Sequence, residues 1–114
     1  MNFYGKNKYF NKKTEVDGII FDSKREASRW LELKMLERAG KITDLERQVR
    51  FEVCPKKYAN KRARYYIADF VYKEDGKPVI EDVKSYMTRK LAVYSLKKAL
   101  VQVNYPEYEF REIC

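Results

Sequence analysis

The spacing of apolar and polar residues predicts a small α/β (α+β) domain. Apolar residues on both sides of Asp17-Gly18 predict a short hairpin over residues 14–21. Ser23 is a typical helix N-cap, and Gly40 is a typical helix end. Between them, helical spacing places the apolar residues on one face: Ala27, Trp30, Leu31, Leu33 and Leu36. We therefore expect a helix directly after the hairpin.

The rest of the chain predicts four strands and a second helix. Runs rich in β-branched and aromatic residues predict strands over residues 48–53, 63–73, 78–84 and 108–113. The second helix is expected from Thr88 to Asn104, with an apolar face of Ala92, Leu96, Ala99, Leu100 and Val103. After the hairpin the order is helix, three strands, helix, strand. This order favours helices that flank a small mixed sheet.

Length and composition agree with one domain. The chain has 114 residues, of which 45% are hydrophobic, enough for one core. We expect residues 1–13 to form a basic arm and residues 14–114 to form the domain. No apolar run exceeds four residues, whereas a membrane span needs about 20. The first residues also lack the apolar segment of a signal peptide, so we expect a cytoplasmic protein.

Histidine is absent and cysteine occurs twice, at Cys54 and Cys114. The chain therefore lacks the residues for Ser-His-Asp or Cys-His catalysis and for a histidine-containing zinc site. Two cysteines are also too few for a disulfide scaffold, and we expect reduced thiols. Any chemistry must come from carboxylates, lysines and hydroxyls, and we expect a metal ion to take part.

The net charge of +8 is concentrated in two segments that contain no acidic residue. Such segments attract polyanions, above all nucleic-acid phosphates. Their basic residues are Lys6, Lys8, Lys12, Lys13, Lys56, Lys57, Lys61, Arg62 and Arg64. On the second helix, Lys90, Tyr94 and Lys97 share one face and are further candidates for backbone contacts. The alternative in both places is a solvated basic surface.

The predicted turn at residues 74–77 fixes which strand residues oppose each other. If Asp75 and Gly76 are its two central residues, paired numbers add up to 151 and Asp69 faces Asp82. Opposed carboxylates repel, and Mg²⁺ or Mn²⁺ would neutralise them. Lys84 shares the face of Asp82. The alternative is a salt bridge from Lys84 to one acid, with the other acid in solvent.

Two further polar residues have two interpretations each. Glu26 lies three residues after Ser23 and either completes a capping box or begins a sheet-facing stripe with Trp30 and Leu33. Its carboxylate could then approach the metal. Gln48 is either an ordinary strand-edge residue or a neighbour of the same site, and the residues alone favour the first.

Three stretches together resemble the PD-(D/E)XK nuclease superfamily: Val16 to Ala27, Tyr66 to Phe70 and Val79 to Ser85. The resemblance runs from about Lys12 to Ile113. It is closest to a family of small phage and prophage proteins labelled as a domain of unknown function. Transposon-end nucleases and Holliday-junction resolvases are related to it. The chain departs from the superfamily pattern at Ala68, where proline is usual.

The resemblance implies a restriction-endonuclease-like core and an endodeoxyribonuclease that requires Mg²⁺, for which Mn²⁺ substitutes. It implies that Asp69, Asp82, Glu26 and Val83 hold the metal, that Lys84 positions the attacking water and that Gln48 lies nearby. A phage-encoded resolvase of branched DNA, acting as a homodimer in the host cytoplasm, is the function expected by analogy. The alternatives are a non-catalytic nucleic-acid-binding module with the same fold and a basic RNA-binding protein.

Overall fold

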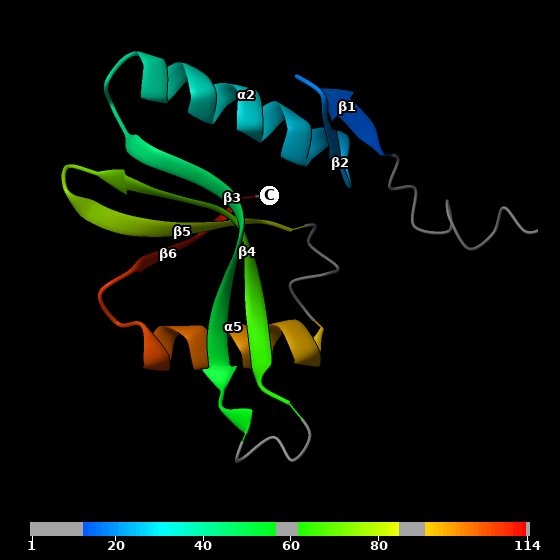
Figure 1. The fold of residues 1–114 in the computed structure, drawn as a ribbon, viewed down its shortest axis with the longest axis vertical. Coiled ribbons are helices and arrows are strands. Elements are labelled where there is room, and N and C mark those ends of the chain that lie inside the picture. The colour runs from blue at the N-terminus through cyan, green and yellow to red at the C-terminus, as the bar shows by residue number, and fades with distance from the viewer. Residues whose placement is uncertain (1–12, 57–61, 85–90, 114) are drawn as a thin grey trace, which may run out of the picture.

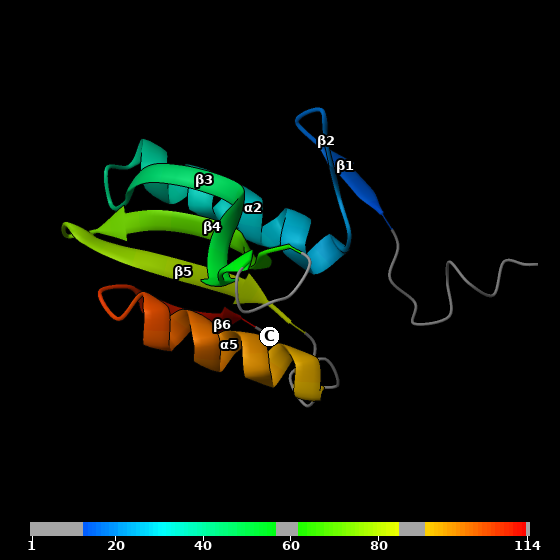
Figure 2. The same ribbon diagram turned by 60° about the horizontal axis from the view of Figure 1, so that its bottom comes forward.

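The computed structural model describes residues 13–56, 62–84 and 91–113, which form a hairpin, two helices and a mixed four-stranded sheet (Figure 1). The sheet has the order β3-β4-β5-β6. Its strands are β3 (Thr43–Cys54), β4 (Arg64–Glu74), β5 (Lys77–Val83) and β6 (Glu109–Ile113). Helix α2 (Lys24–Arg38) and helix α5 (Ala92–Asn104) lie on opposite sides of it (Figure 2). The predicted α+β class and element order are confirmed.

The N-terminal hairpin and the start of α2 follow their local sequence signals. Strands β1 (Thr14–Val16) and β2 (Ile19–Phe21) pair through a turn in which Asp17 and Gly18 both have positive φ, as a type I′ turn requires. Ser23 then caps α2, because its hydroxyl oxygen accepts a hydrogen bond from the Glu26 amide at 3.1 Å. Residues 1–12 of the predicted arm lie outside the described residues.

Strand β3 is longer than predicted and contains a kink. It begins at Thr43 rather than at Gln48; residues 43–47 are mostly polar, so their sequence carries little of the apolar alternation that predicts a strand. Gln48 has a φ of 54°, in the left-handed region that residues other than glycine rarely adopt. The regular pairing of β3 with β4 skips this residue and continues on both sides of it. The kink therefore lies opposite Asp69.

The turn between β4 and β5 has the predicted register. Asp75 and Gly76 have φ values of 54° and 78°, again a type I′ turn. Five consecutive pairs follow, from Glu74 with Lys77 to Phe70 with Glu81. Every pair satisfies the predicted sum, so Asp69 and Asp82 are the next two opposed residues.

Helix α5 presents a different face to the sheet from the one predicted. Tyr94 and Val101 are buried, whereas Leu96 and Val103 are more than half exposed. Apolar residues surround much of this helix, so their spacing alone did not determine the buried face. Thr88, the predicted cap, lies outside the described residues. In the described ranges no helix is long and apolar enough to cross a bilayer.

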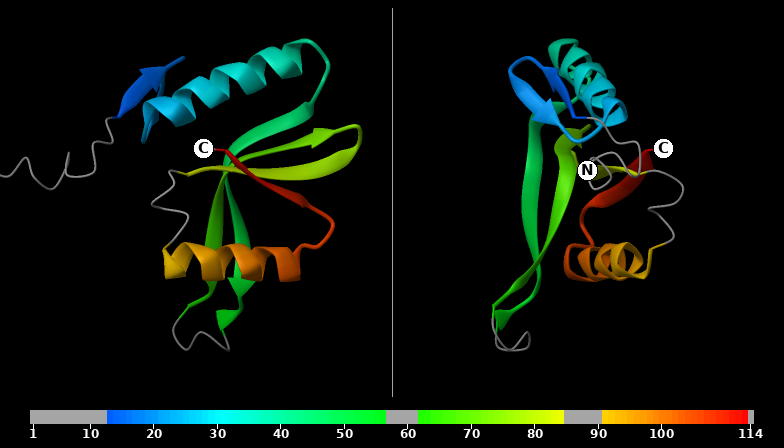
Figure 3. Two further views of the ribbon diagram at one scale, coloured as in Figure 1. Left: turned by 180° about the vertical axis from the view of Figure 1, so that it is seen from behind. Right: turned by 90° about the vertical axis from the view of Figure 1, so that its right-hand side faces the viewer.

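Two apolar clusters fill the two sides of the sheet. One joins α2 and the N-terminal hairpin to the sheet: Phe21, Ala27, Trp30, Leu33, Ile42, Phe70, Tyr72 and Val79. The other lies under α5: Phe51, Val53, Tyr66, Ala68, Ile80, Tyr94 and Val101. Ala68 and Phe70 are two residues apart on β4 yet belong to different clusters. The strands therefore change the face they present near Asp69, as the curved ribbon in Figure 3 shows.

A buried ion pair fastens α2 to β5. Glu81 is completely buried, and both of its carboxylate oxygens accept hydrogen bonds from Arg29, at 2.6 and 2.8 Å. The Tyr72 hydroxyl donates a third, at 2.6 Å. A fork of this kind satisfies a buried carboxylate and sets the position of the helix along the strand.

We expect Arg29→Met to lower the free energy of unfolding by about 3–5 kcal/mol, because the buried carboxylate of Glu81 would lose its cationic partner and two hydrogen bonds. Urea denaturation monitored by circular dichroism measures the loss. Arg25→Met is the matched control: Arg25 is an exposed arginine of the same helix, and its change should stay within about 0.5 kcal/mol. Equal losses in both variants would contradict this role of the ion pair.

Candidate active site

The centre of the candidate site is a pair of buried aspartates. Asp69 is 8% exposed and Asp82 is fully buried. The β4–β5 register makes them the next opposed residues after Phe70 and Glu81. Asp69 also accepts a hydrogen bond from the Val83 amide at 2.8 Å, and the Tyr66 hydroxyl donates one to Asp82. The register and the burial of both acids agree with the predicted pairing.

Burial of this pair changes its protonation. Desolvation, the hydrogen bond to Asp82 and the charge of Asp82 together raise the pKa of Asp69 to about 8. At neutral pH the pair therefore retains a proton. Two acids held in contact at such a cost are typical of a functional site rather than of a packed core.

Lys84 supplies a positive charge at the edge of the pair. Its ammonium lies 3.2 Å from Asp82 Oδ1 and 5.5 Å from the centre of the Tyr94 ring. Asp82 Oδ1 is buried and accepts no hydrogen bond from the described residues. This oxygen is a hard donor with unused lone pairs, which fits a divalent cation such as Mg²⁺.

Glu26 and Gln48 meet beside the kink. Glu26 is 6% exposed, and the Gln48 side-chain amide donates a hydrogen bond to its Oε2 at 3.4 Å. Burial and then the charge of Asp22 raise the pKa of Glu26, and Asp82 contributes in the same direction. Glu26 thus belongs to the N-cap through its backbone, while its side chain lies toward the sheet. Gln48, which the residues alone did not single out, is its partner.

The described residues contain no group of three His, Cys, Asp or Glu side chains arranged to hold a metal ion. Glu26 therefore does not complete a three-carboxylate site with Asp69 and Asp82 in this structure. Val83 contributes its amide to Asp69, and its role as a metal ligand stays a prediction. The donor set that the structure brings together is the aspartate pair.

Sequence reasoning missed two hydroxyl groups and one acid at this site. Tyr66 holds Asp82 in place, and Tyr94 donates a hydrogen bond to Glu112 at 2.6 Å. Glu112 is the partner of Asp82 in the parallel β5–β6 pairing. Burial raises the pKa of both tyrosines, so both remain hydrogen-bond donors. Tyr94, expected to face nucleic acid, is buried instead, and only the pairing of distant strands could have indicated these contacts.

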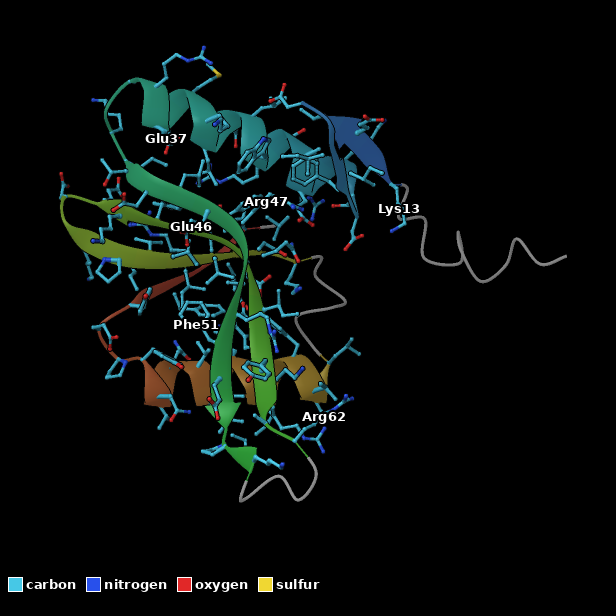
Figure 4. All side chains as sticks on the ribbon, viewed as in Figure 1. Lys13, Glu37, Glu46, Arg47, Phe51 and Arg62 are labelled. Atoms are coloured by element: carbon cyan, nitrogen blue, oxygen red, sulfur yellow. The ribbon has the colours of Figure 1, made fainter. Side chains whose placement is uncertain are left out.

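The predicted basic residues are distributed over several elements. Lys13 forms an exposed ion pair with Asp22, and Lys97 is half-buried. Lys56, Arg62 and Arg64 are exposed near the end of the β3–β4 hairpin that is farther from α2; Figure 4 labels Arg62 there. The remaining predicted contacts lie outside the described residues: Lys6, Lys8, Lys12, Lys57, Lys61 and Lys90.

Fold and site together define a small α+β protein with a buried aspartate pair and an adjacent lysine at the bend of its sheet. The chain belongs to the family described as "Protein of unknown function (DUF1064)", whose model matches residues 6–114. No curated protein and no solved structure gives a significant match to the chain.

We expect Asp69→Asn to stabilise the protein more at pH 9 than at pH 5. The ordinary pKa of 3.8 is raised to about 8 in the folded state, so between these values the folded state binds more protons than the unfolded state. Wild-type stability therefore falls as the pH rises through this range, and asparagine removes the effect. The gain at pH 9 should exceed that at pH 5 by at least about 1.4 kcal/mol, the equivalent of one pKa unit.

Urea denaturation of both proteins at the two pH values, without metal, measures this difference. Asp75→Asn serves as the control, because Asp75 is an exposed aspartate in the turn of the same hairpin and asparagine tolerates its positive φ. An equal effect of Asp69→Asn at both pH values would contradict the raised pKa.

Proposed function

We propose that this protein is a metal-dependent endodeoxyribonuclease of the PD-(D/E)XK superfamily. The observation that carries the proposal is the position of Asp69 and Asp82 opposite each other in the protein interior, with the Lys84 ammonium 3.2 Å from Asp82. Acid, acid and lysine at these positions are the three residues that the sequence resemblance assigns to the reaction. A protein that only binds nucleic acid gains nothing from two buried acids that repel each other.

Mg²⁺ is the proposed cofactor, with Mn²⁺ as a substitute. Asp69 and Asp82 would hold it, and the resemblance adds Glu26 and Val83 as further ligands. Asp82 Oδ1 forms an ion pair with Lys84 but accepts no hydrogen bond from the described residues, and carboxylate oxygens are the preferred donors for both ions. A bound cation of this kind polarises a scissile phosphate and lowers the pKa of its water.

The side chains around the pair have separate roles in this proposal. Lys84 orients the attacking water or stabilises negative charge on the phosphate. Tyr66 fixes the orientation of Asp82, because its hydroxyl donates a hydrogen bond to that carboxylate. Gln48 fixes Glu26 in the same way. Hydrogen-bonded partners of this type hold ligands in one geometry.

A nucleic acid is the proposed substrate because the chain carries a net charge of +8, and DNA in particular is what the sequence resemblance implies. Phosphate contacts from lysine and arginine predict weak sequence preference and strong salt dependence. Cleavage of branched DNA by a phage-encoded resolvase, in the cytoplasm of the host, is proposed on the sequence resemblance alone. Resolution of a two-fold junction needs two sites, which points to a homodimer.

One observation favours a second candidate function, a non-catalytic nucleic-acid-binding module. Among the described residues, no three metal-ligating side chains are arranged around one point. A two-aspartate site with backbone and water ligands satisfies Mg²⁺, which usually keeps several waters. The nuclease therefore remains the function that the site supports best, and cleavage assays separate the two candidates.

We expect Mg²⁺-dependent cleavage of end-labelled DNA that Asp82→Asn and Lys84→Ala each reduce by at least about a hundredfold. This loss exceeds the tenfold to hundredfold effect typical of residues that only orient a ligand. Single-stranded, duplex, flap and four-way substrates should be tested with Mg²⁺, Mn²⁺ and EDTA, and the best substrate identifies the biological role. Gel electrophoresis of the labelled products measures the rates.

Asp75→Asn and Lys41→Ala are the matched controls, because both residues are exposed and lie outside the site. Both control proteins should cleave at the wild-type rate. DNA binding without cleavage in the presence of any metal would contradict the nuclease proposal and favour the binding module. Cleavage that survives in Asp82→Asn would contradict the assignment of Asp82 to the active site.

Glu26→Gln separates the capping role of Glu26 from its role in the site. Helix capping uses the Glu26 amide, which the variant retains, so stability should be unchanged or slightly higher once the buried acid is removed. Cleavage should nevertheless require about 10–100 times more Mg²⁺ for the same rate. A Mg²⁺ titration of the cleavage rate measures this shift. An unchanged titration would show that Glu26 serves only the helix N-terminus and has no role in metal binding.

A further inference from the structure

An open groove lies on the β3–β4 hairpin beyond the kink. It encloses about 560 Å³ and is lined by Arg50, Arg62, Ala63, Arg64, Tyr65 and Ile67. It begins two residues after Gln48 along β3 and two residues before Asp69 along β4. At about 3.4 Å per residue, this separation is about 7 Å along the strands. Along the chain the groove therefore comes within two residues of Asp69 on β4, whereas Asp82 lies on β5.

The groove occupies the side of the hairpin that faces away from α5. Alternation along the strands directs Phe51 and Tyr66 into the cluster under α5, whereas the paired residues Arg50 and Ile67 point to the other side. The right-hand view in Figure 3 shows α5 on one side of this part of the hairpin. Ile67 is 51% exposed, which is high for an apolar strand residue beside a core.

The lining combines positive charge with flat or apolar surface. Arg50, Arg62 and Arg64 contribute three guanidinium groups, and no carboxylate lines the groove. Glu52 lies on the same side, opposite Tyr65 in the strand pairing, but is not part of the lining. Within the described residues, none of the three arginines forms an ion pair. Their charge is therefore available to an anion.

Arg50 and Tyr65 form a stacked platform in this groove. The Arg50 guanidinium carbon lies 4.1 Å from the centre of the Tyr65 ring. Aromatic rings and guanidinium planes both stack on bases that have left the double helix. In an intact duplex the base faces are covered by their neighbours, so a platform of this kind has nothing to contact there.

We propose that this groove binds an unpaired DNA strand, with bases on the Arg50–Tyr65 platform and Ile67 and phosphates at Arg62 and Arg64. The inference rests on the proposed nuclease function, for which it names the substrate class: DNA with a single-stranded segment next to the cleavage site. Flaps and branched junctions supply such a segment.

Binding in EDTA tests the groove without cleavage. Fluorescence anisotropy should show that the full chain binds a dT strand of about 15 nucleotides more tightly than a duplex of the same length. Tyr65→Leu keeps an apolar side chain but removes the ring, and should weaken binding to the strand about tenfold, as expected for one lost base stack. Duplex affinity should stay unchanged, and Tyr65→Phe should bind the strand like the wild type.

A second readout reports stacking directly. A 2-aminopurine base in the dT strand should lose fluorescence when it binds the wild type and Tyr65→Phe, and should not lose it with Tyr65→Leu. Arg64→Ala should weaken binding and lower the slope of affinity against salt by about one. Arg38→Ala, which removes an exposed arginine at the end of α2, should leave both unchanged.

Several results would overturn the proposal: equal strand affinity of Tyr65→Leu and wild type, tighter binding of the duplex, or tighter binding of a uridine RNA strand. Failure of the nuclease is a separate result. If the wild type cleaves no DNA with Mg²⁺ but Tyr65→Leu loses strand binding, the strand-binding role of the groove is supported and the nuclease function is contradicted. If Asp82→Asn abolishes cleavage while Tyr65→Leu binds the strand normally, the nuclease function is supported and the strand-binding role of the groove is contradicted.

Discussion

The candidate site depends on the register of the β4–β5 hairpin, which a two-residue turn determines. Asp75 and Gly76 both adopt positive φ, and this turn fits the twist of the strands it joins. The resulting pairs bring Asp82 beside Asp69 and direct Glu81 to the opposite side of the sheet. A slip of one residue would exchange these two acids, since side chains alternate between faces. It would remove both the aspartate pair and the partner of Arg29.

Glu81 and Asp82 are adjacent and completely buried, but the hydrogen bonds and cations around their two carboxylates differ. Both oxygens of Glu81 accept hydrogen bonds from Arg29, and Tyr72 adds a third. Asp82 receives a hydrogen bond from Tyr66, while its other oxygen lies near Lys84 without accepting one. One acid is therefore fully satisfied within the fold and fastens α2 to the sheet. The other retains binding capacity, and this incomplete satisfaction distinguishes a candidate site from a structural ion pair.

Local signals in the sequence predicted the features that depend on neighbouring residues. Asp75-Gly76 determined the hairpin register, and Ser23 predicted the start of α2, because turns and caps use side chains within a few residues. The buried face of α5 was predicted only in part: Leu100 packs against the cluster under α5, but Tyr94 was missed, since its contact with Glu112 joins a helix to a distant strand. The hydrogen bond from Tyr66 to Asp82 was missed for the same reason. Strict alternation along β4 would place Tyr66 and Asp69 on opposite faces, and the curvature of the strand brings both to Asp82.

The kink at Gln48 connects the site with the outer hairpin. Its left-handed backbone interrupts the pairing opposite Asp69, and its side chain reaches Glu26 on α2. Before the kink the strands pack under α2, as Arg47 over the Phe21 ring at 4.9 Å illustrates (Figure 4). Beyond it they pack on α5 with Phe51 and leave Arg50 and Ile67 on the outside. Irregular strand geometry of this kind re-aims side chains and is common next to active sites. A regular strand would keep Arg47 and Phe51 on one face and could not pack the first under α2 and the second under α5.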